Sequence, residues 1–312
     1  MHKPILAEFL VITILAFTQS ALADTANLPD LITDRPDQTE STSIVLPGYY
    51  QIETGVNVTS SADGSKQSSG PSTLLRIGIA EWMELRLGVA GWLEGNAENP
   101  SGFGDAEVGF KSFLFSEAGI RPEAALLVHF SVPVGENGHS SDRSDPSFRL
   151  SFSHTLSKRI SLGYNAGIAW STEQEQFDTW SSEKLRGRAE RAIQNLTEPF
   201  APSGFIGARI WDDAIATAAA RLVPQQKDRD TTSKFEYTLA LGMDVSPRVG
   251  AYVELFGETP LSSDSSEEHY VDGGITFLLR DNMQLDLEAG AGLNDAADDW
   301  FVGAGLSVRF PN

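Results

Sequence analysis

The chain has 312 residues, a formal net charge of −20 and no cysteine. The lack of cysteine excludes disulfide frameworks, thiol nucleophiles and cysteine-based metal sites. The excess of acid argues against nucleic acid as a partner, because a phosphate backbone is bound by basic surface. Beyond the N-terminus, the sequence has no run of about 18 apolar residues, so a helical membrane protein is not expected.

The N-terminus has the pattern of a secretion signal. A short basic start is followed by an apolar stretch at 5–17 and by the small-x-small sequence Ala21-Leu22-Ala23. This order predicts a signal peptide over 1–23, removed on export. Residues 24–48 are then expected to form a periplasmic N-terminal segment.

Most of the remaining chain alternates between apolar and polar residues with a period of two. In "WFVGAGLSVRF" at 300–310, one face carries Trp300, Val302 and Leu306, whereas the other carries Gly303, Ser307 and Arg309. Such alternation predicts a strand with one apolar face, and about ten residues suffice for a tilted strand to cross a bilayer. About twelve strands of this kind are predicted, near 49–59, 72–80, 83–92, 104–115, 123–134, 146–156, 160–170, 235–245, 249–258, 268–279, 282–293 and 299–310.

Two further patterns favour a transmembrane antiparallel up-and-down β-barrel over a soluble sandwich, which would show the same alternation. Long polar connections alternate with tight ones, as in barrels with short periplasmic turns and longer outer loops. Aromatic residues also gather at strand ends, where membrane barrels carry interfacial girdles. The barrel is expected over 49–312, in a bacterial outer membrane. The aromatic residues at strand ends are Tyr50, Trp82, Trp92, Trp170, Phe235, Tyr270, Trp300 and Phe310.

The stretch 171–234 interrupts the alternation and is predicted to be an extracellular insertion. "SSEKLRGRAERAIQNL" and "WDDAIATAAARLVP" have helical spacing and composition, and Pro224 ends the second. The alternative is a hairpin made of 204–211 and 214–223, which would give fourteen strands. Because alanine is a poor strand former, short helices in a long loop are favoured.

Several local sequences together resemble a known family. They include "TDRPDQTES", "PSTLLRIGIAEWMELRLG", "SGFGDAEVGFK", "SVPVG", "YVELFGE" and "QLDLEAGAGLNDAADDWFVGAGLSVRF". In this order they resemble the bacterial outer-membrane transporter family labelled with the MetA pathway of phenol degradation. The resemblance covers most of the mature chain apart from 171–234. It implies an outer-membrane barrel and supplies no catalytic residues.

If the apolar series faces lipid, the opposite series lines the lumen. Its acids outnumber its bases, which would favour cations over anions if the barrel conducts. A barrel of this size can hold either a narrow channel or a lumen filled with polar side chains, and the sequence leaves both open. The predicted lumen residues are Glu53, Arg76, Glu84, Arg86, Asp105, Glu107, Lys111, Arg149, Glu236, Asp244, Glu254, Asp272, Asp286, Glu288 and Arg309.

No catalytic set, metal site or cofactor is predicted. His129 and Ser131 share one face of a strand, but there is no paired signature of an envelope enzyme. The acids in "NDAADDW" at 294–300 lack the spacing of a calcium loop, so solvated loop acids are the preferred interpretation.

The sequence "TDRPDQTES" precedes the first strand and is therefore expected at the periplasmic mouth. Asp34, Arg35, Asp37 and Glu40 are predicted to act as a latch. The segment should tuck inward, with Arg35 meeting an acid and Asp34 or Asp37 meeting Arg86 or Arg309.

Taken together, these features predict a channel or transporter for passive passage of small solutes, and not an enzyme. Hydrophobic or aromatic compounds are suggested by the family resemblance alone. The alternatives are a plugged barrel with a structural or partner-binding role and, less favoured, an envelope lipid enzyme. The expected partners are outer-membrane lipid and lipopolysaccharide, an unidentified small solute, and the barrel-assembly machinery, which would read the C-terminal strand.

Overall fold

The computed structural model describes residues 29–61, 64–94, 101–136, 139–174, 229–261 and 266–311, together with 191 and 194. The predicted signal peptide (1–23) lies outside these residues. So do the predicted helices and the alternative hairpin of the 171–234 insertion, except that Arg191 and Gln194 are helical. Within the described ranges, no helix is both long and apolar enough to cross a membrane.

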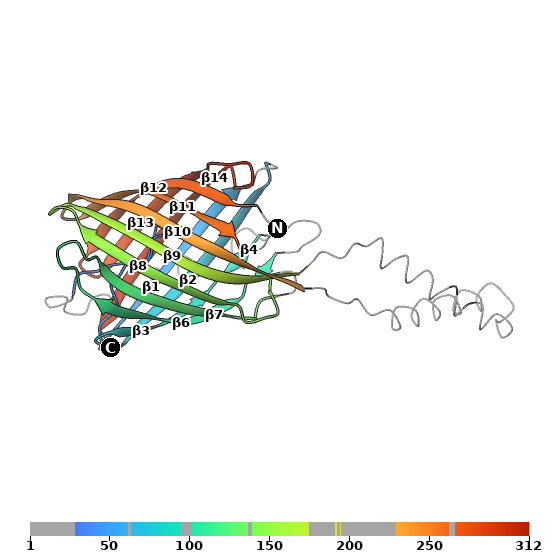
Figure 1. Cartoon of the computed structure of the whole chain (residues 1–312), viewed down its shortest axis with the longest axis horizontal. Coiled ribbons are helices and arrows are strands. Elements are labelled where there is room, and N and C mark those ends of the chain that lie inside the picture. The colour runs from blue at the N-terminus through green and yellow to red at the C-terminus, as the bar shows by residue number, and fades with distance from the viewer. Residues whose placement is uncertain are drawn as a thin grey trace. The chain divides into compact units, whose positions relative to one another are not determined.

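One antiparallel sheet closes on itself to form a barrel (Figure 1). Closure is made by β1, which pairs with β2 on one side and with β14 on the other. The pairing with β14 covers the whole length of β1, from Tyr49 opposite Pro311 to Ser60 opposite Trp300. The barrel strands are β1 (Tyr49–Ser60), β2 (Lys66–Ala80), β3 (Met83–Val89), β6 (Ala106–Phe115), β7 (Glu123–Val132), β8 (Pro146–Thr155), β9 (Ile160–Gln174), β10 (Arg229–Ser246), β11 (Val249–Pro260), β12 (Glu268–Arg280), β13 (Met283–Gly292) and β14 (Trp300–Pro311).

The twelve-strand prediction is confirmed, with changes at the strand ends. β2 begins at Lys66, earlier than predicted, because the chain from Lys66 to Ser69 continues the ladder with β1 beyond a bulge. The sheet has two extra strands, but they are the short β4 (Trp92–Leu93) and β5 (Gly102–Phe103), which extend from β2 outside the closed ring.

Residues 172–231 form a second compact unit. The structure describes in it the ends of β9 and β10. There the hydroxyls of Thr172 and Thr231 lie 2.9 Å apart.

The distribution of side chains is inverted relative to a soluble protein. On β13, Leu287 is 53% exposed on the outer face, whereas its neighbour Asp286 is 1% exposed on the inner face. Arg76 and Lys111 are fully buried inside the ring. A soluble sandwich would bury the leucine and expose the charges, so the structure decides between the two alternatives that alternation alone left open.

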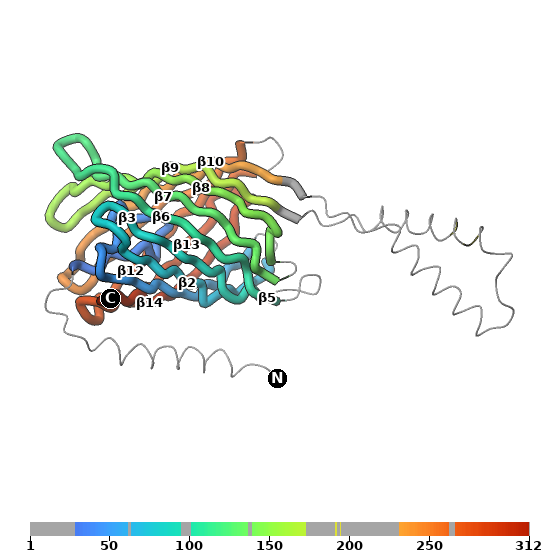
Figure 2. Tube along the Cα trace, turned by 90° about the horizontal axis from the view of Figure 1, so that it is seen from below, coloured from blue at the N-terminus to red at the C-terminus, as the bar shows by residue number. Residues whose placement is uncertain are grey.

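The two ends of the barrel differ. At the short-turn end, tight turns join β2 to β3, β8 to β9, β10 to β11 and β12 to β13, and β1 begins where β14 ends. At the other, long-loop end, β9 ends and β10 begins. The described part of the N-terminal segment, residues 29–48, precedes β1 and runs inside the ring. Figure 2 shows the Cα trace of the barrel from below.

The outward face predicts a depth-dependent cost for charge. Leu287→Arg, in the middle of β13, should lower the free energy of unfolding in lipid vesicles by about 2 to 4 kcal/mol. Leu293→Arg, just beyond the end of β13 and similarly exposed, should cost about 0 to 1 kcal/mol. Urea titration of vesicle-embedded protein measures both. Equal losses at the two positions would contradict a membrane-spanning outer face.

Candidate functional site

Three cationic side chains form a buried cluster on neighbouring strands. Arg76 on β2 lies opposite Arg86 on β3, and Lys111 follows on β6. All three are at most 2% exposed. The strands supply acids as well, because Arg76 contacts Glu53 and Glu84, each at 2.9 Å. A further anion comes from the N-terminal segment.

The carboxylate of Asp34 is the centre of this cluster. Its Oδ2 atom lies 2.5 Å from Arg86 Nη1, 3.0 Å from Arg76 Nη1 and 2.7 Å from Lys111 Nζ. Its Oδ1 atom accepts hydrogen bonds from the backbone N–H and the hydroxyl of Ser41. Burial alone would raise the pKa of Asp34, but the three cations together hold that pKa well below its usual range. Asp34 therefore stays ionised inside the barrel.

Arg35, the next residue, contacts β13, which is separated from β2 by β1 and β14. Its Nη2 atom lies 3.2 Å from Asp286 Oδ1 and 3.8 Å from Glu288 Oε1. The guanidinium fits against Gly55 and Gly305, which pair with each other in the middle of the β1–β14 ladder. A Cβ atom at either glycine would lie 2.4 Å from the guanidinium, so these two positions form a socket that a larger residue would fill.

The second half of the segment binds further strands through uncharged groups as well. The Gln38 N–H donates to Glu254 Oε2 on β11 at 2.8 Å, and the Thr39 hydroxyl contacts both Glu254 and Thr238 on β10. The Glu40 N–H donates to the Asn165 side chain on β9 at 2.7 Å. The segment thus spans the lumen from β14 and β1 to β9.

Both oxygens of the Glu40 carboxylate accept hydrogen bonds from Arg86 Nη2 at 3.0 Å, and Lys111 lies 3.5 Å away. Downstream, the Val45 N–H donates to Glu84, and Pro47 forms an isolated bridge with Gly78 of β2. All four residues expected in the latch therefore lie inside the ring, with Asp34, Arg35 and Glu40 in ion pairs with the wall.

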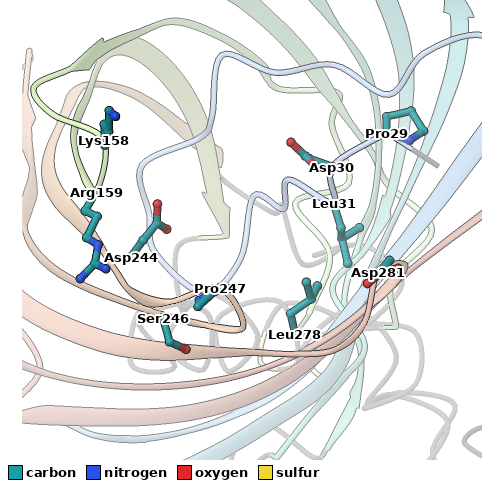
Figure 3. Close-up of a pocket in the computed structure, with 10 residues that line it drawn as sticks. All are labelled: Pro29, Asp30, Leu31, Lys158, Arg159, Asp244, Ser246, Pro247, Leu278 and Asp281. Carbon is teal, nitrogen blue, oxygen red and sulfur yellow. The ribbon is translucent and has the colours of Figure 1, made fainter. Parts of the chain in front are cut away.

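The segment enters at the short-turn end beside a pocket of about 680 Å³ (Figure 3). Arg309, predicted as a partner of Asp34 or Asp37, instead donates to the backbone carbonyls of Pro29 and Asp30. The pocket is lined by Pro29, Asp30, Leu31, Lys158, Arg159, Asp244, Ser246, Pro247, Leu278 and Asp281. Predicted as a lumen residue, Asp244 is exposed at this mouth.

The wall formed by β11, β12 and β13 is acidic. Glu254, Asp272 and Glu288 are each at most 6% exposed, and Asp37 of the segment lies near Glu254 and Asp272. Burial raises the pKa of Asp37 well above its usual range, and the nearby Glu254 carboxylate adds to this shift. The lumen is therefore divided between a cationic wall that holds Asp34 and an acidic wall that faces Asp37.

Other predicted lumen residues have partners on the wall itself. Arg149 on β8 forms an ion pair with Glu236 on β10 at 2.7 Å, and Glu107 is half-exposed 3.5 Å from His129. Asp105 differs from its predicted place on a strand. It precedes β6 and accepts hydrogen bonds from the N–H groups of Gly135 and Ser141, so it organises a loop.

The structure gives structural partners to the two residues considered for catalysis. His129 Nε2 accepts a hydrogen bond from Arg86 Nε at 3.0 Å. The Ser131 hydroxyl donates to the backbone of Arg143. Among the described residues, no group of three or more histidine, aspartate or glutamate side chains could hold a metal ion.

Sequence reasoning expected Arg35 to meet an acid, and Asp34 or Asp37 to meet Arg86 or Arg309. Of these contacts the structure contains Arg35 with Asp286 and Asp34 with Arg86. It missed Arg76 and Lys111 as partners of Asp34. A signal for them existed, because the tight β2–β3 turn places Arg76 opposite Arg86. The neutral partners were also missed, namely Ser151, Asn165, Thr238 and Gln284. Nothing in the sequence separates these from other polar residues.

Comparison with solved structures identifies the fold. The COG4313 outer membrane channel from Pseudomonas putida F1 aligns with a TM-score of 0.56 and 11% identity, covering 89% of this chain and 100% of that one. The KdgM porin aligns with a TM-score of 0.46 and 8% identity, covering 83% of this chain and 98% of that one. The alignment with the first of these shows that the two chains share the barrel fold.

No curated protein matches the sequence. A family model described as "Putative MetA-pathway of phenol degradation" matches residues 33–310, a range that begins at the N-terminal segment and ends in β14. The chain belongs to this family.

Proposed function

We propose that this protein is an outer-membrane channel for passive passage of small solutes, and that the N-terminal segment is a latch that closes it. The observation that carries the proposal is the path of the segment across the lumen. Asp34 binds the cationic wall on β2, β3 and β6, whereas Thr39 binds β10 and β11, which lie across the ring. In this position the segment blocks the lumen, so passage requires that it moves.

The chemistry of the contacts supports a movable segment. Its bonds to the wall are ion pairs and hydrogen bonds, and water can replace each of them when the segment leaves. In the proposed orientation, the short-turn end faces the periplasm, as in other outer-membrane barrels, and the 171–234 insertion lies outside the cell.

A permanently plugged barrel with a structural or partner-binding role is the second candidate. It is favoured by the breadth of the docking, since the segment bonds to strands as far apart as β1 and β9. The solute is a separate question. Hydrophobic or aromatic compounds are supported only by the phenol-degradation description of the family.

A disulfide lock distinguishes the two candidates. The hydroxyl oxygens of Thr39 and Thr238 are 2.6 Å apart, and the chain has no cysteine of its own. The double variant Thr39→Cys/Thr238→Cys should therefore be able to form a disulfide between segment and wall. In planar bilayers we expect channel openings from the wild type, none from the oxidised double variant, and recovery after reduction.

The single variant Thr39→Cys controls for loss of the threonine contacts. Equal conductance of the oxidised and reduced double variant would show that the segment does not close the path. If neither the wild type nor the reduced variant conducts, and neither permits liposome swelling, the channel proposal is wrong and the plugged barrel remains.

Two identical substitutions three residues apart should change docking in opposite directions. Asp34→Asn removes the anion shared by three buried cations and should weaken docking by about 3 to 5 kcal/mol, the usual cost of breaking a buried pair. Asp37 has a raised pKa when docked, so docking favours its protonated form and weakens as the pH rises from its ordinary pKa to the raised value. Asp37→Asn removes this penalty and should strengthen docking.

Hydrogen exchange of the amides of Gln38, Glu40 and Val45, which donate to the wall, measures both effects. Protection should fall in Asp34→Asn and rise in Asp37→Asn at neutral pH. The same direction of change in both variants would rule out the electrostatic account of docking.

The acidic lumen predicts a preference for cations. Reversal potentials under a salt gradient should show cation selectivity, and this selectivity should decrease in Glu107→Gln and Asp286→Asn. Glu81→Gln, in the exposed β2–β3 turn, serves as the control and should have little effect. Anion selectivity, or unchanged selectivity in both inner variants, would refute this prediction.

A further inference from the structure

The acidic wall lacks the compensation that the cationic wall receives. Glu254 and Asp272 lie directly opposite each other on β11 and β12, and Glu288 follows on β13. Asp37 of the segment approaches from the lumen and acts electrostatically on the same group. Among the described residues, the cation close to these acids is Arg35. Its guanidinium is 3.8 Å from Glu288 and nearer to Asp286.

Two oxygens of this acidic cluster (Asp37, Tyr252, Glu254, Asp272 and Glu288) are buried without a hydrogen-bond partner. They are Asp272 Oδ1 and Glu288 Oε2. Asp272 is 4% exposed and Glu288 is 6% exposed. A buried carboxylate oxygen without a donor is costly, and buried carboxylates that repel one another add to this cost. A bound donor carrying positive charge would relieve both.

The hydrogen bonds that the acidic cluster already makes define what kind of cation matches it. The Tyr252 hydroxyl donates to Asp272 Oδ2 at 3.3 Å, which leaves Oδ1 for another donor. Glu254 is already occupied by Gln38 and Thr39 of the segment. Because the described acids do not converge in a metal-binding group, a compact divalent ion is not the matching ligand. An ammonium group, whose N–H bonds spread toward separate acceptors, matches better.

We propose that the acidic cluster binds the ammonium group of a small organic cation, with Asp272 Oδ1 and Glu288 Oε2 as its acceptors. This inference rests on the proposed channel only for transport. As a binding site, it stands on the geometry of the wall.

The test is calorimetric titration of the purified full chain in detergent micelles with ethylammonium chloride. We expect saturable binding that weakens by about tenfold or more in Asp272→Asn and in Glu288→Gln, because each removes one charged acceptor. Glu81→Gln, an acid-to-amide change in an exposed turn, should bind like the wild type. Tetramethylammonium, which has the charge but no N–H donor, and Mg²⁺ should both bind more weakly than ethylammonium.

Heat-modifiable migration on SDS gels verifies that each variant is a folded barrel. If an acceptor variant does not fold, Tyr252→Phe takes its place. This change frees the second oxygen of Asp272 and should tighten binding of ethylammonium. The absence of saturable binding to the wild type, or binding of Mg²⁺ or tetramethylammonium as strong as that of ethylammonium, overturns the proposal. So does undiminished binding in folded Asp272→Asn and Glu288→Gln.

Conductance separates this inference from the proposed function. Wild-type protein that conducts in bilayers but binds no ethylammonium keeps the channel and loses the site. Protein that binds ethylammonium through Asp272 and Glu288 but never conducts keeps the site and loses the channel.

Discussion

The need to pair every backbone polar group within lipid determines the rest of this structure. A sheet can meet that need only by closing, which it does when β1 pairs with β14 along its full length. Closure sends one face of each strand to lipid and the other to the lumen. Every charge carried by the strands then has to be compensated inside a narrow space, where unpaired ions are expensive.

The N-terminal segment follows from this constraint. Arg76, Arg86 and Lys111 lie on neighbouring strands, and Asp34 places one carboxylate within 3.0 Å of all three. Arg35, the next residue, carries the opposite charge to Asp286 on β13, at the edge of the acidic wall. Adjacent residues of opposite sign thus match two parts of the wall of opposite sign, and this match fixes the position of the segment in the lumen.

The strands were predictable because alternation is local and repeats. Leu287 outside and Asp286 inside are consecutive residues, so the sequence alone reports which face each joins. Contacts between the segment and the wall are less accessible. Asp34 binding Arg86 could be anticipated from charge, but Thr39 binding Thr238 depends on two hydroxyls that meet only after the ring has closed. Asp105 was misplaced because the alternation of apolar and polar residues extends to positions before Ala106, where β6 begins. The alternation therefore does not mark the start of this strand.

The breadth of the docking does not by itself make it strong. When a charged group leaves water to form a buried ion pair, the net gain in free energy is small, because desolvation of both charges opposes their attraction. The segment buries few large apolar side chains that would hold it irrespective of charge; Val45 is fully buried, but Ile32 and Leu46 are 42% exposed. Many polar contacts therefore specify one position without a large penalty for leaving it. Asp37, half-buried near the acidic wall, opposes docking and brings the two states closer in free energy. A lumen organised in this way is suited to a segment that closes the barrel and can also be released.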